Sequence, residues 1–223
     1  MLCVKIPFMK NLILASTSPR RKDLLSLFGI SFEIIPADLD ESRQPGENPA
    51  DYVRRLACEK AQKVAQVTEG LILAADTTVA DGDEILGKPE DQSDARRMLL
   101  QLRGRIHQVY TGIALVESPT GKSYEAVCCT DVPMRNYSGA EIEAYIATGN
   151  PMDKAGAYAI QHSGFRPVEN LEGCFASVMG LPLCHLVPGL QRFGLEIPAD
   201  MVERCEAYLD YSCPTLLTVM ARD

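Results

Sequence analysis

The sequence contains no tryptophan, and its aromatic fraction is only 6%. Proteins that hold single-stranded nucleic acids stack the bases on aromatic side chains, so we expect no stacking platform of that kind. Positive charge is also in deficit, because the formal net charge is −8. Binding along a nucleic-acid polymer needs a basic face that neutralises phosphates. We therefore exclude nucleic-acid polymers as partners, whereas a small anionic ligand needs only local positive charge.

Long apolar runs and zinc-type cysteine spacings are missing as well. No stretch approaches the length of a membrane span, and Lys5, Pro7 and Lys10 interrupt the region where a signal peptide would need its apolar core. The eight cysteines form no CxxC pair, which argues against a zinc site. We therefore expect reduced thiols in a cytoplasmic protein without a membrane partner. Met9 is an alternative start, because the recognisable pattern begins directly after it.

Four common catalytic motifs are absent: the GxxxxGK[S/T] phosphate loop, the GxGxxG turn, the HExxH zinc helix and the GxSxG elbow. The three histidines lie far apart in the sequence and are more readily explained as structural residues. These absences exclude the commonest nucleotide-loop, dinucleotide, zinc-protease and serine-hydrolase sites.

What is present is a basic cluster at the start of a predicted helix. Ser18 fits the N-cap position and Pro19 the first helical position. Arg20, Arg21 and Lys22 then fall in the first turn, where the positive end of the helix dipole disfavours cations. A sequence that breaks a local rule so strongly points to a site at which a bound anion compensates.

A phosphate chain is the natural candidate for that anion. It would meet free helix N–H groups and the hydroxyls of Ser16, Thr17 and Ser18. The guanidinium groups of Arg20 and Arg21 would add charge-assisted hydrogen bonds. The alternative is a solvated basic turn, since basic clusters are common on protein surfaces.

A second candidate is Asp76, which directly follows the apolar run 71–75. A carboxylate immediately after a strand lies where open α/β sheets bind their ligands. The alternative is a strand-end aspartate that caps the next turn. Asp40 and Glu41, in a polar loop, could join Asp76 around Mg²⁺ or Mn²⁺, although by themselves they read as a solvated acidic loop.

Three further side chains suit a nucleotide. Lys88, held between a glycine and a proline, can contact a phosphate as a point charge. Lys60 lies on a predicted helix, where the alternative is an ordinary surface lysine. Gln161 carries donors and an acceptor and can read a base edge, the alternative being a glutamine that simply ends a strand.

Strand and helix signals alternate along the chain, which predicts an α/β fold with one long mixed sheet. A domain boundary could lie near residue 132, but no linker composition supports separate domains. The predicted strands are 11–15, 31–35, 71–75, 107–116 and 122–132, with a hairpin turn at Asp81-Gly82 and short strands within 154–179. The predicted helices are 19–28, 49–67, 93–102 capped by Ser93, 138–148 opened by a capping box, 182–193 and 199–211.

Taken in this order, the segments resemble the Maf family of nucleoside triphosphate pyrophosphatases, from about residue 10 to residue 193. The motifs that carry the resemblance are Ser16–Arg21, Ala74–Thr77, Gly87–Pro89, Gly104–Gly112, Lys154–Gln161 and Val178–Pro182. The resemblance implies a long, curved mixed β-sheet flanked by helices, with two lobes and a central cleft. It implies a single domain over 1–223, with a core at about 10–193 and a C-terminal helical extension at about 194–223. Family members often form homodimers, so the oligomeric state stays open.

The resemblance also implies an activity: cleavage of a nucleoside triphosphate between the α- and β-phosphates with a divalent cation, Mg²⁺ or Mn²⁺. Asp76 matches the general base of the family, and Glu41 and Asp76 are the expected metal ligands. The expected substrate contacts are Ser16, Ser18, Arg20, Arg21, Lys60, Thr77, Lys88 and Gln161.

Arg20, Thr77 and Gln161 are similar to the uridine/thymidine branch, so dTTP, UTP and modified uridine triphosphates are the expected substrates. One departure is Ser177, where members often carry asparagine. The alternatives are a purine-type inosine/xanthosine triphosphate pyrophosphatase, a non-catalytic nucleotide-binding regulator, and a structural protein with a vestigial site.

Overall fold

The computed structural model describes residues 11–214. Within them a six-stranded mixed sheet has the order β2-β1-β3-β5-β6, with β4 paired to the far end of β3. The pairs β1–β2 and β1–β3 are parallel, and the others are antiparallel. The strands are β1 (Leu12–Leu14), β2 (Phe32–Ile34), β3 (Gly70–Asp81), β4 (Glu84–Leu86), β5 (Ile106–Ser118) and β6 (Lys122–Pro133).

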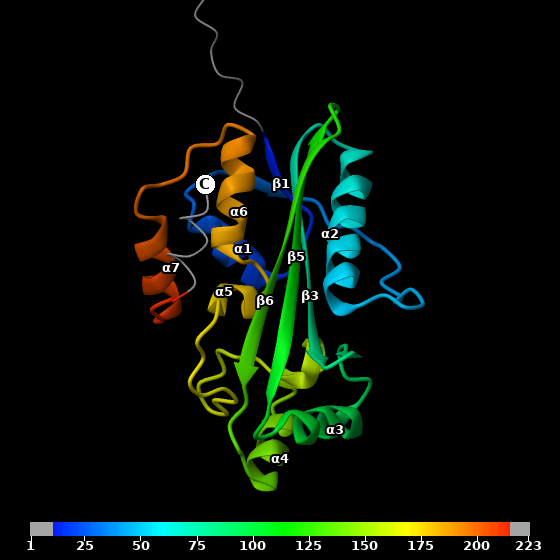
Figure 1. Ribbon diagram of the computed structural model, residues 1–223, viewed down its shortest axis with the longest axis vertical. Coiled ribbons are helices and arrows are strands. Elements are labelled where there is room, and N and C mark those ends of the chain that lie inside the picture. Colours follow the sequence, from blue (N-terminus) through cyan, green and yellow to red (C-terminus); the bar gives the residue numbers. More distant parts are fainter. Residues whose placement is uncertain (1–10, 215–223) are drawn as a thin grey trace, which may run out of the picture.

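Helices cover both faces of this sheet (Figure 1). Helix α2 lies on one face of the upper half, and α1, α5, α6 and α7 lie on the other, while α3 and α4 gather at the lower end of the long strands. The α-helices are α1 (Pro19–Ser26), α2 (Pro49–Ala65), α3 (Gln92–Leu102), α4 (Gly139–Ala147), α5 (Phe175–Met179), α6 (Leu183–Arg192) and α7 (Met201–Leu209). Two short 3₁₀ helices, η1 (Asn150–Asp153) and η2 (Ala155–Ala157), follow α4.

The apolar run that opens β3 explains the two-sided packing. Leu71 and Leu73 belong to the cluster shared with α1, α5, α6 and α7, whereas Ile72 and Ala74 pack with α2. Side chains alternate between the faces of a strand, so a continuous apolar run marks a strand that is covered on both sides. A third cluster joins the lower ends of β3 and β5 to α3 and α4. The expected α/β fold of two lobes, linked by long strands, is confirmed.

The edge of β3 has a gap that matters for the site. β1 pairs with β3 only as far as Leu73, and β4 begins to pair with the same strand at Val79. Between these partners no strand formed by residues 11–214 covers that edge, while the opposite edge stays paired to β5 throughout. Side chains from both faces of β3 can therefore reach one opening there.

Several sequence predictions need correction. The apolar run does not end its strand at residue 75, because pairing with β5 carries β3 on to Asp81. The cap of α3 is Asp91, whose side chain accepts from the backbone N–H of Asp94, and not Ser93. Among the described residues, 154–179 contains 3₁₀ turns, helix α5 and one isolated bridge instead of short strands. The capping box at Ser138 is confirmed.

Other expectations meet the limits of the described chain. Part of the predicted C-terminal extension forms α7, whereas 215–223 and the alternative start at Met9 lie outside the described residues. No disulfide joins the cysteines within residues 11–214. Over the same range, none of the helices combines the length and apolar composition needed to cross a bilayer.

The contact of α2 with β5 leaves no room for a side chain at Gly112. A Cβ there would lie 2.4 Å from the carbonyl oxygen of Val53 and 2.9 Å from the backbone nitrogen of Arg54. We expect Gly112→Ala to lower the free energy of unfolding by about 1–3 kcal/mol, because a helix backbone must move. Chemical denaturation measures the change. The control is Gly139→Ala, where an added Cβ meets no atom within 4 Å, and equal stability of the two variants would contradict the expectation.

Candidate active site

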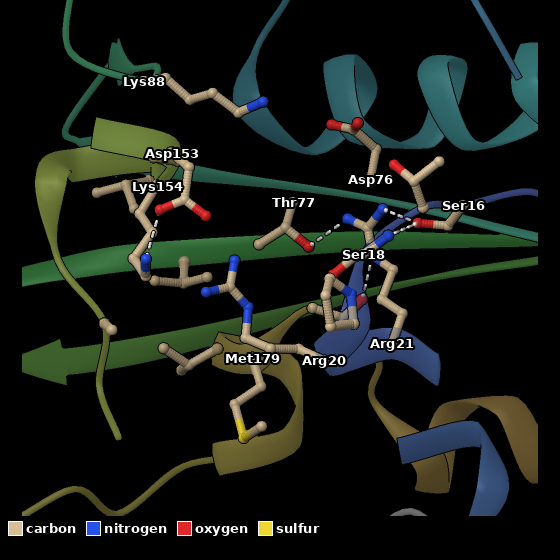
Figure 2. A pocket seen from close by; sticks show the side chains of 18 of the residues that line it. Ser16, Ser18, Arg20, Arg21, Asp76, Thr77, Lys88, Asp153, Lys154 and Met179 are labelled. Carbon is tan, nitrogen blue, oxygen red and sulfur yellow. Dashed lines mark hydrogen bonds and ion pairs between the residues drawn. The ribbon is translucent and has the colours of Figure 1, made fainter. Parts of the chain in front are cut away.

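A cleft with a volume of 500 Å³ opens at the gap in the edge of β3. That volume is within the range of small-ligand pockets. Its walls come from the loop after β1, the start of α1, β3, β5, α5 and the segment of η1 and η2 (Figure 2). The ten predicted site residues all line it: Ser16, Ser18, Arg20, Arg21, Glu41, Lys60, Asp76, Thr77, Lys88 and Gln161. Asp40 does not, because its carboxylate accepts from the N–H and hydroxyl of Ser42 within its own loop.

The centre of the site is a buried ion pair between β3 and α2. Asp76 and Lys60 are each 7% exposed, and Lys60 Nζ lies 2.6 Å from Asp76 Oδ1. The same ammonium lies 2.5 Å from Glu41 Oε1. Lysines are rarely buried unless they are paired, so the surface-lysine alternative for Lys60 is wrong. One cation thus holds two carboxylates from separate segments.

The surroundings of Asp76 set its acidity. Burial raises the pKa of Asp76 above its ordinary value, because a charged carboxylate is less stable away from water. The positive charges of Lys60 and Arg21 oppose that rise in pKa, and Glu41 adds to it. A carboxylate whose pKa is raised towards neutrality is a better proton acceptor than an ordinary aspartate.

Arg21 is fixed on the Asp76 side of the cleft by three hydrogen bonds. Its Nε donates to the carbonyl of Gly180 at 3.0 Å, Nη1 to Ser16 Oγ at 3.2 Å and Nη2 to Thr77 Oγ1 at 3.3 Å. Ser18 occupies the N-cap position of α1 as predicted, and its side chain makes no capping hydrogen bond. The start of α1 therefore keeps the uncapped N–H groups that suit an anion, as the sequence predicts.

Two threonine hydroxyls next to Arg21 form a short hydrogen-bonded chain in which each donor can be assigned. Thr111 Oγ1 donates to the carbonyl of Ser177 at 2.8 Å and lies 3.0 Å from Thr77 Oγ1. Because a hydroxyl has one proton, Thr77 donates to Thr111 and uses its lone pairs to accept from Arg21. Sequence reasoning missed Thr111, although it lies within a segment that carries the family resemblance. At Ser177 the backbone carbonyl makes this contact, so the departure from asparagine leaves the chain intact.

Arg20 points to the other half of the cleft. Its guanidinium extends past Thr77 towards Asp153 and Lys154, away from that of Arg21 (Figure 2). Successive residues of an α-helix point about 100° apart, since a turn takes 3.6 residues. The two guanidinium groups line the same cleft but point in different directions (Figure 2), and the expectation that both meet one phosphate chain stays a prediction. Lys88 reaches into the cleft from the opposite wall.

The histidine of β5 stays a structural residue. His107 is fully buried, and its Nε2 lies 2.8 Å from the hydroxyl of Tyr158 behind the cleft wall. Burial lowers the pKa of His107 to about 4, so the ring is neutral at physiological pH.

The donor set suits a divalent cation that arrives with its substrate. Glu41 and Asp76 flank a shared positive charge, the Lys60 ammonium. Within the described residues no group of three histidine, cysteine, aspartate or glutamate side chains is arranged to hold a metal alone. Mg²⁺ in nucleotide enzymes is commonly held by one or two carboxylates together with phosphate oxygens. Two carboxylates fit that pattern.

Comparisons with known proteins identify the same family as the sequence motifs. The model of the Maf family, described as Maf-like protein, matches residues 11–193. A dTTP/UTP pyrophosphatase of Anaeromyxobacter dehalogenans (strain 2CP-1 / ATCC BAA-258) is 49% identical over 190 residues, which cover 84% of this chain and 96% of the relative. A dTTP/UTP pyrophosphatase of Dictyoglomus thermophilum is 46% identical over 191 residues, covering 84% and 98%. The solved structure of the Staphylococcus aureus Ham1 protein is 12% identical, with 90% and 98% coverage and a TM-score of 0.47.

The ion pair predicts how the acidity of Asp76 responds to mutation. Lys60→Met removes a charge and a hydrogen bond that lower the pKa of Asp76, while the burial that raises it remains. We expect the pKa of Asp76 to rise further in this variant. Carbon-13 NMR titration of labelled aspartate carboxyls measures it. Lys63→Met, on the exposed side of α2, is the control, and an unchanged or lower pKa in Lys60→Met would refute the expectation.

Proposed function

This chain belongs to the Maf-like protein family, and from that premise we propose that it hydrolyses dTTP and UTP to their monophosphates and pyrophosphate. The observation that carries the proposal is the meeting, in one cleft, of the buried Asp76 with the cationic groups of Arg21, Lys60 and Lys88. A triphosphate needs several positive charges, and its hydrolysis needs a proton acceptor beside the water that attacks.

The proposed step is an in-line displacement at the α-phosphorus. A water oxygen forms the new bond to phosphorus, and the bond from that phosphorus to the oxygen bridging to the β-phosphate breaks. The water proton passes to Asp76 Oδ, and pyrophosphate leaves with the bonding electron pair. The raised pKa of Asp76 supports this role, because it makes the carboxylate a better proton acceptor than an ordinary aspartate.

The charge that grows on the leaving pyrophosphate is balanced by preorganised donors. Arg21 is already held by three hydrogen bonds, so its guanidinium needs little reorganisation when the charge develops. Lys88 and the N–H groups at the start of α1 add positive potential from two other walls. Lys60 neutralises the two carboxylates and keeps them from repelling the phosphates.

Glu41 and Asp76 are the residues that would hold Mg²⁺ or Mn²⁺, which would supply neutralisation of phosphate charge and a more acidic water. We place the reaction in the cytoplasm, which agrees with cysteines that form no disulfide in residues 11–214. The names of the two relatives favour pyrimidine over purine triphosphates. A retained proton acceptor speaks for an enzyme over a nucleotide-binding regulator.

A panel of triphosphates tests the activity. We expect equimolar monophosphate and pyrophosphate from dTTP and UTP, and far slower release from CTP, ATP, GTP and ITP. EDTA should abolish release, and added Mg²⁺ or Mn²⁺ should restore it. A coupled pyrophosphate assay and anion-exchange chromatography measure the products. Preferential cleavage of ITP would support the purine-type alternative, and nucleotide binding without release would support the regulator.

Replacement of the proposed base tests the mechanism. Asp76→Asn keeps the size of the side chain but removes its basicity, so we expect kcat to fall by about 10²–10⁴-fold with nucleotide binding retained. The matched control is Asp81→Asn on the same strand, because Asp81 pairs with Arg105 at 3.1 Å and does not line the cleft. Unimpaired turnover by a folded Asp76→Asn protein would exclude Asp76 as the base.

A further inference from the structure

The cleft has two ends, and β3 sets the distance between them. Asp76 marks the phosphate end, and Val79 lies three residues further along the strand, about 10 Å away at a rise of 3.3 Å per residue. Gly156 of η2 packs on Val79 so closely that a Cβ would lie 2.9 Å from a methyl group of the valine. The segment of η1 and η2 therefore forms the end of the cleft remote from the proposed reaction.

That remote end combines apolar walls with one acid–base pair. Val79, Val109 and Val178 line it and suit the faces of a planar ring. Asp153 and Lys154 also line the cleft, and Lys154 Nζ lies 2.5 Å from Asp153 Oδ1. Neither residue entered the sequence prediction as a site residue.

The two members of the pair differ in exposure. The side chain of Lys154 is 10% exposed and also donates to the carbonyl of Asn150 at 2.7 Å, whereas that of Asp153 is 74% exposed. The lysine is therefore the fixed partner, and the carboxylate remains accessible from the cleft. A hydrogen bond from Lys154, together with the charges of Lys154 and Arg20, lowers the pKa of Asp153, so it is ionised at neutral pH.

This inference rests on the proposed function: we propose that Asp153 selects the base by accepting a hydrogen bond from the N3–H of uracil or thymine. These bases present an N–H donor between two carbonyl oxygens. The carboxylate of Asp153 accepts from the donor, and Lys154 donates to one flanking carbonyl. Arg20 faces Asp153 and is in place to donate to the other, with Gln161 lining the same cleft.

Cytosine is the informative competitor, because it has nearly the same shape. Its N3 carries a lone pair where uracil carries a proton, and its exocyclic amine replaces a carbonyl. A carboxylate facing that lone pair gains no hydrogen bond and suffers electrostatic repulsion. Sites built around a polar contact reject analogues that lack it far more strongly than apolar pockets reject a missing methylene.

The experiment compares kcat/KM for UTP and CTP in the full chain and in Asp153→Asn. The asparagine amide can turn either its oxygen or its NH₂ group to N3, so we expect the UTP/CTP ratio to fall by about 10- to 100-fold. Asp153→Glu should recover part of the ratio. The control is Asp200→Asn, an exposed aspartate outside the cleft whose partner Arg204 lies at 2.9 Å. If Asp153 only shapes the η1 turn, its variants will alter stability and leave the ratio unchanged, which would overturn the proposal.

A binding measurement separates this inference from the proposed activity. The α,β-methylene analogues of UTP and CTP cannot be cleaved between the α- and β-phosphates, so calorimetry reports their affinities whether or not the protein is an enzyme. Absence of pyrophosphate release by the unchanged protein would defeat the proposed function alone. Equal affinity of the unchanged protein for both analogues, or an unchanged affinity ratio in a folded Asp153→Asn, would defeat the role of Asp153 alone.

Discussion

The Lys60 ammonium, held between the carboxylates of Asp76 and Glu41, is the interaction on which the rest of the site depends. Lys60 and Asp76 are buried, whereas the side chain of Glu41 is 54% exposed. Taking the charges of Lys60 and Asp76 out of water is unfavourable, and removal of one partner of such a buried pair destabilises a protein by about 3–5 kcal/mol. The pair therefore constrains how α2 must lie on the sheet. Gly112 allows that placement, because β5 has no side chain where the backbone of α2 passes. The packing of α2 and the position of Lys60 thus share one requirement: α2 must lie in backbone contact with β5 at Gly112.

The gap in the edge of β3 explains why a continuous sheet can carry a reaction centre. Asp76 projects to the α2 face, and Thr77, its neighbour, projects to the α1 face, as alternation along a strand demands. With no strand covering that edge, both side chains border one cleft. Asp76 is buried against Lys60 on one side of β3, while Thr77 accepts a hydrogen bond from Arg21 on the other. A strand paired on both edges would separate these two groups.

Local pattern was enough to find residues that line one cleft, but not their arrangement. Asp76 was identified as the end of a strand, whereas the strand continues because β5 pairs with it over residues far away in sequence. Lys60 looked like a surface residue, since its burial comes from the contact of α2 with the sheet. Arg20 and Arg21 looked equivalent, and only the direction of each side chain divides them (Figure 2). Asp153 carried no signal of its own, because an adjacent acid and base usually form a solvated pair.

Arg21 lies near Asp76, whereas Arg20 points towards Asp153 (Figure 2), so one cleft can hold separate contacts for the phosphates and for the base. In the proposed reaction the end of the cleft with Asp76 and Arg21 meets the phosphates, which every nucleoside triphosphate carries. Contacts to the phosphates therefore do not distinguish one nucleotide from another. A preference for one base must come from side chains that contact the base. Val79, on which Gly156 of η2 packs, lies about 10 Å further along β3 than Asp76, and substitutions that far apart usually act independently. Under the proposed mechanism, such a chain can change the base it accepts through the η1 and η2 segment while Asp76 and Lys60 stay in place.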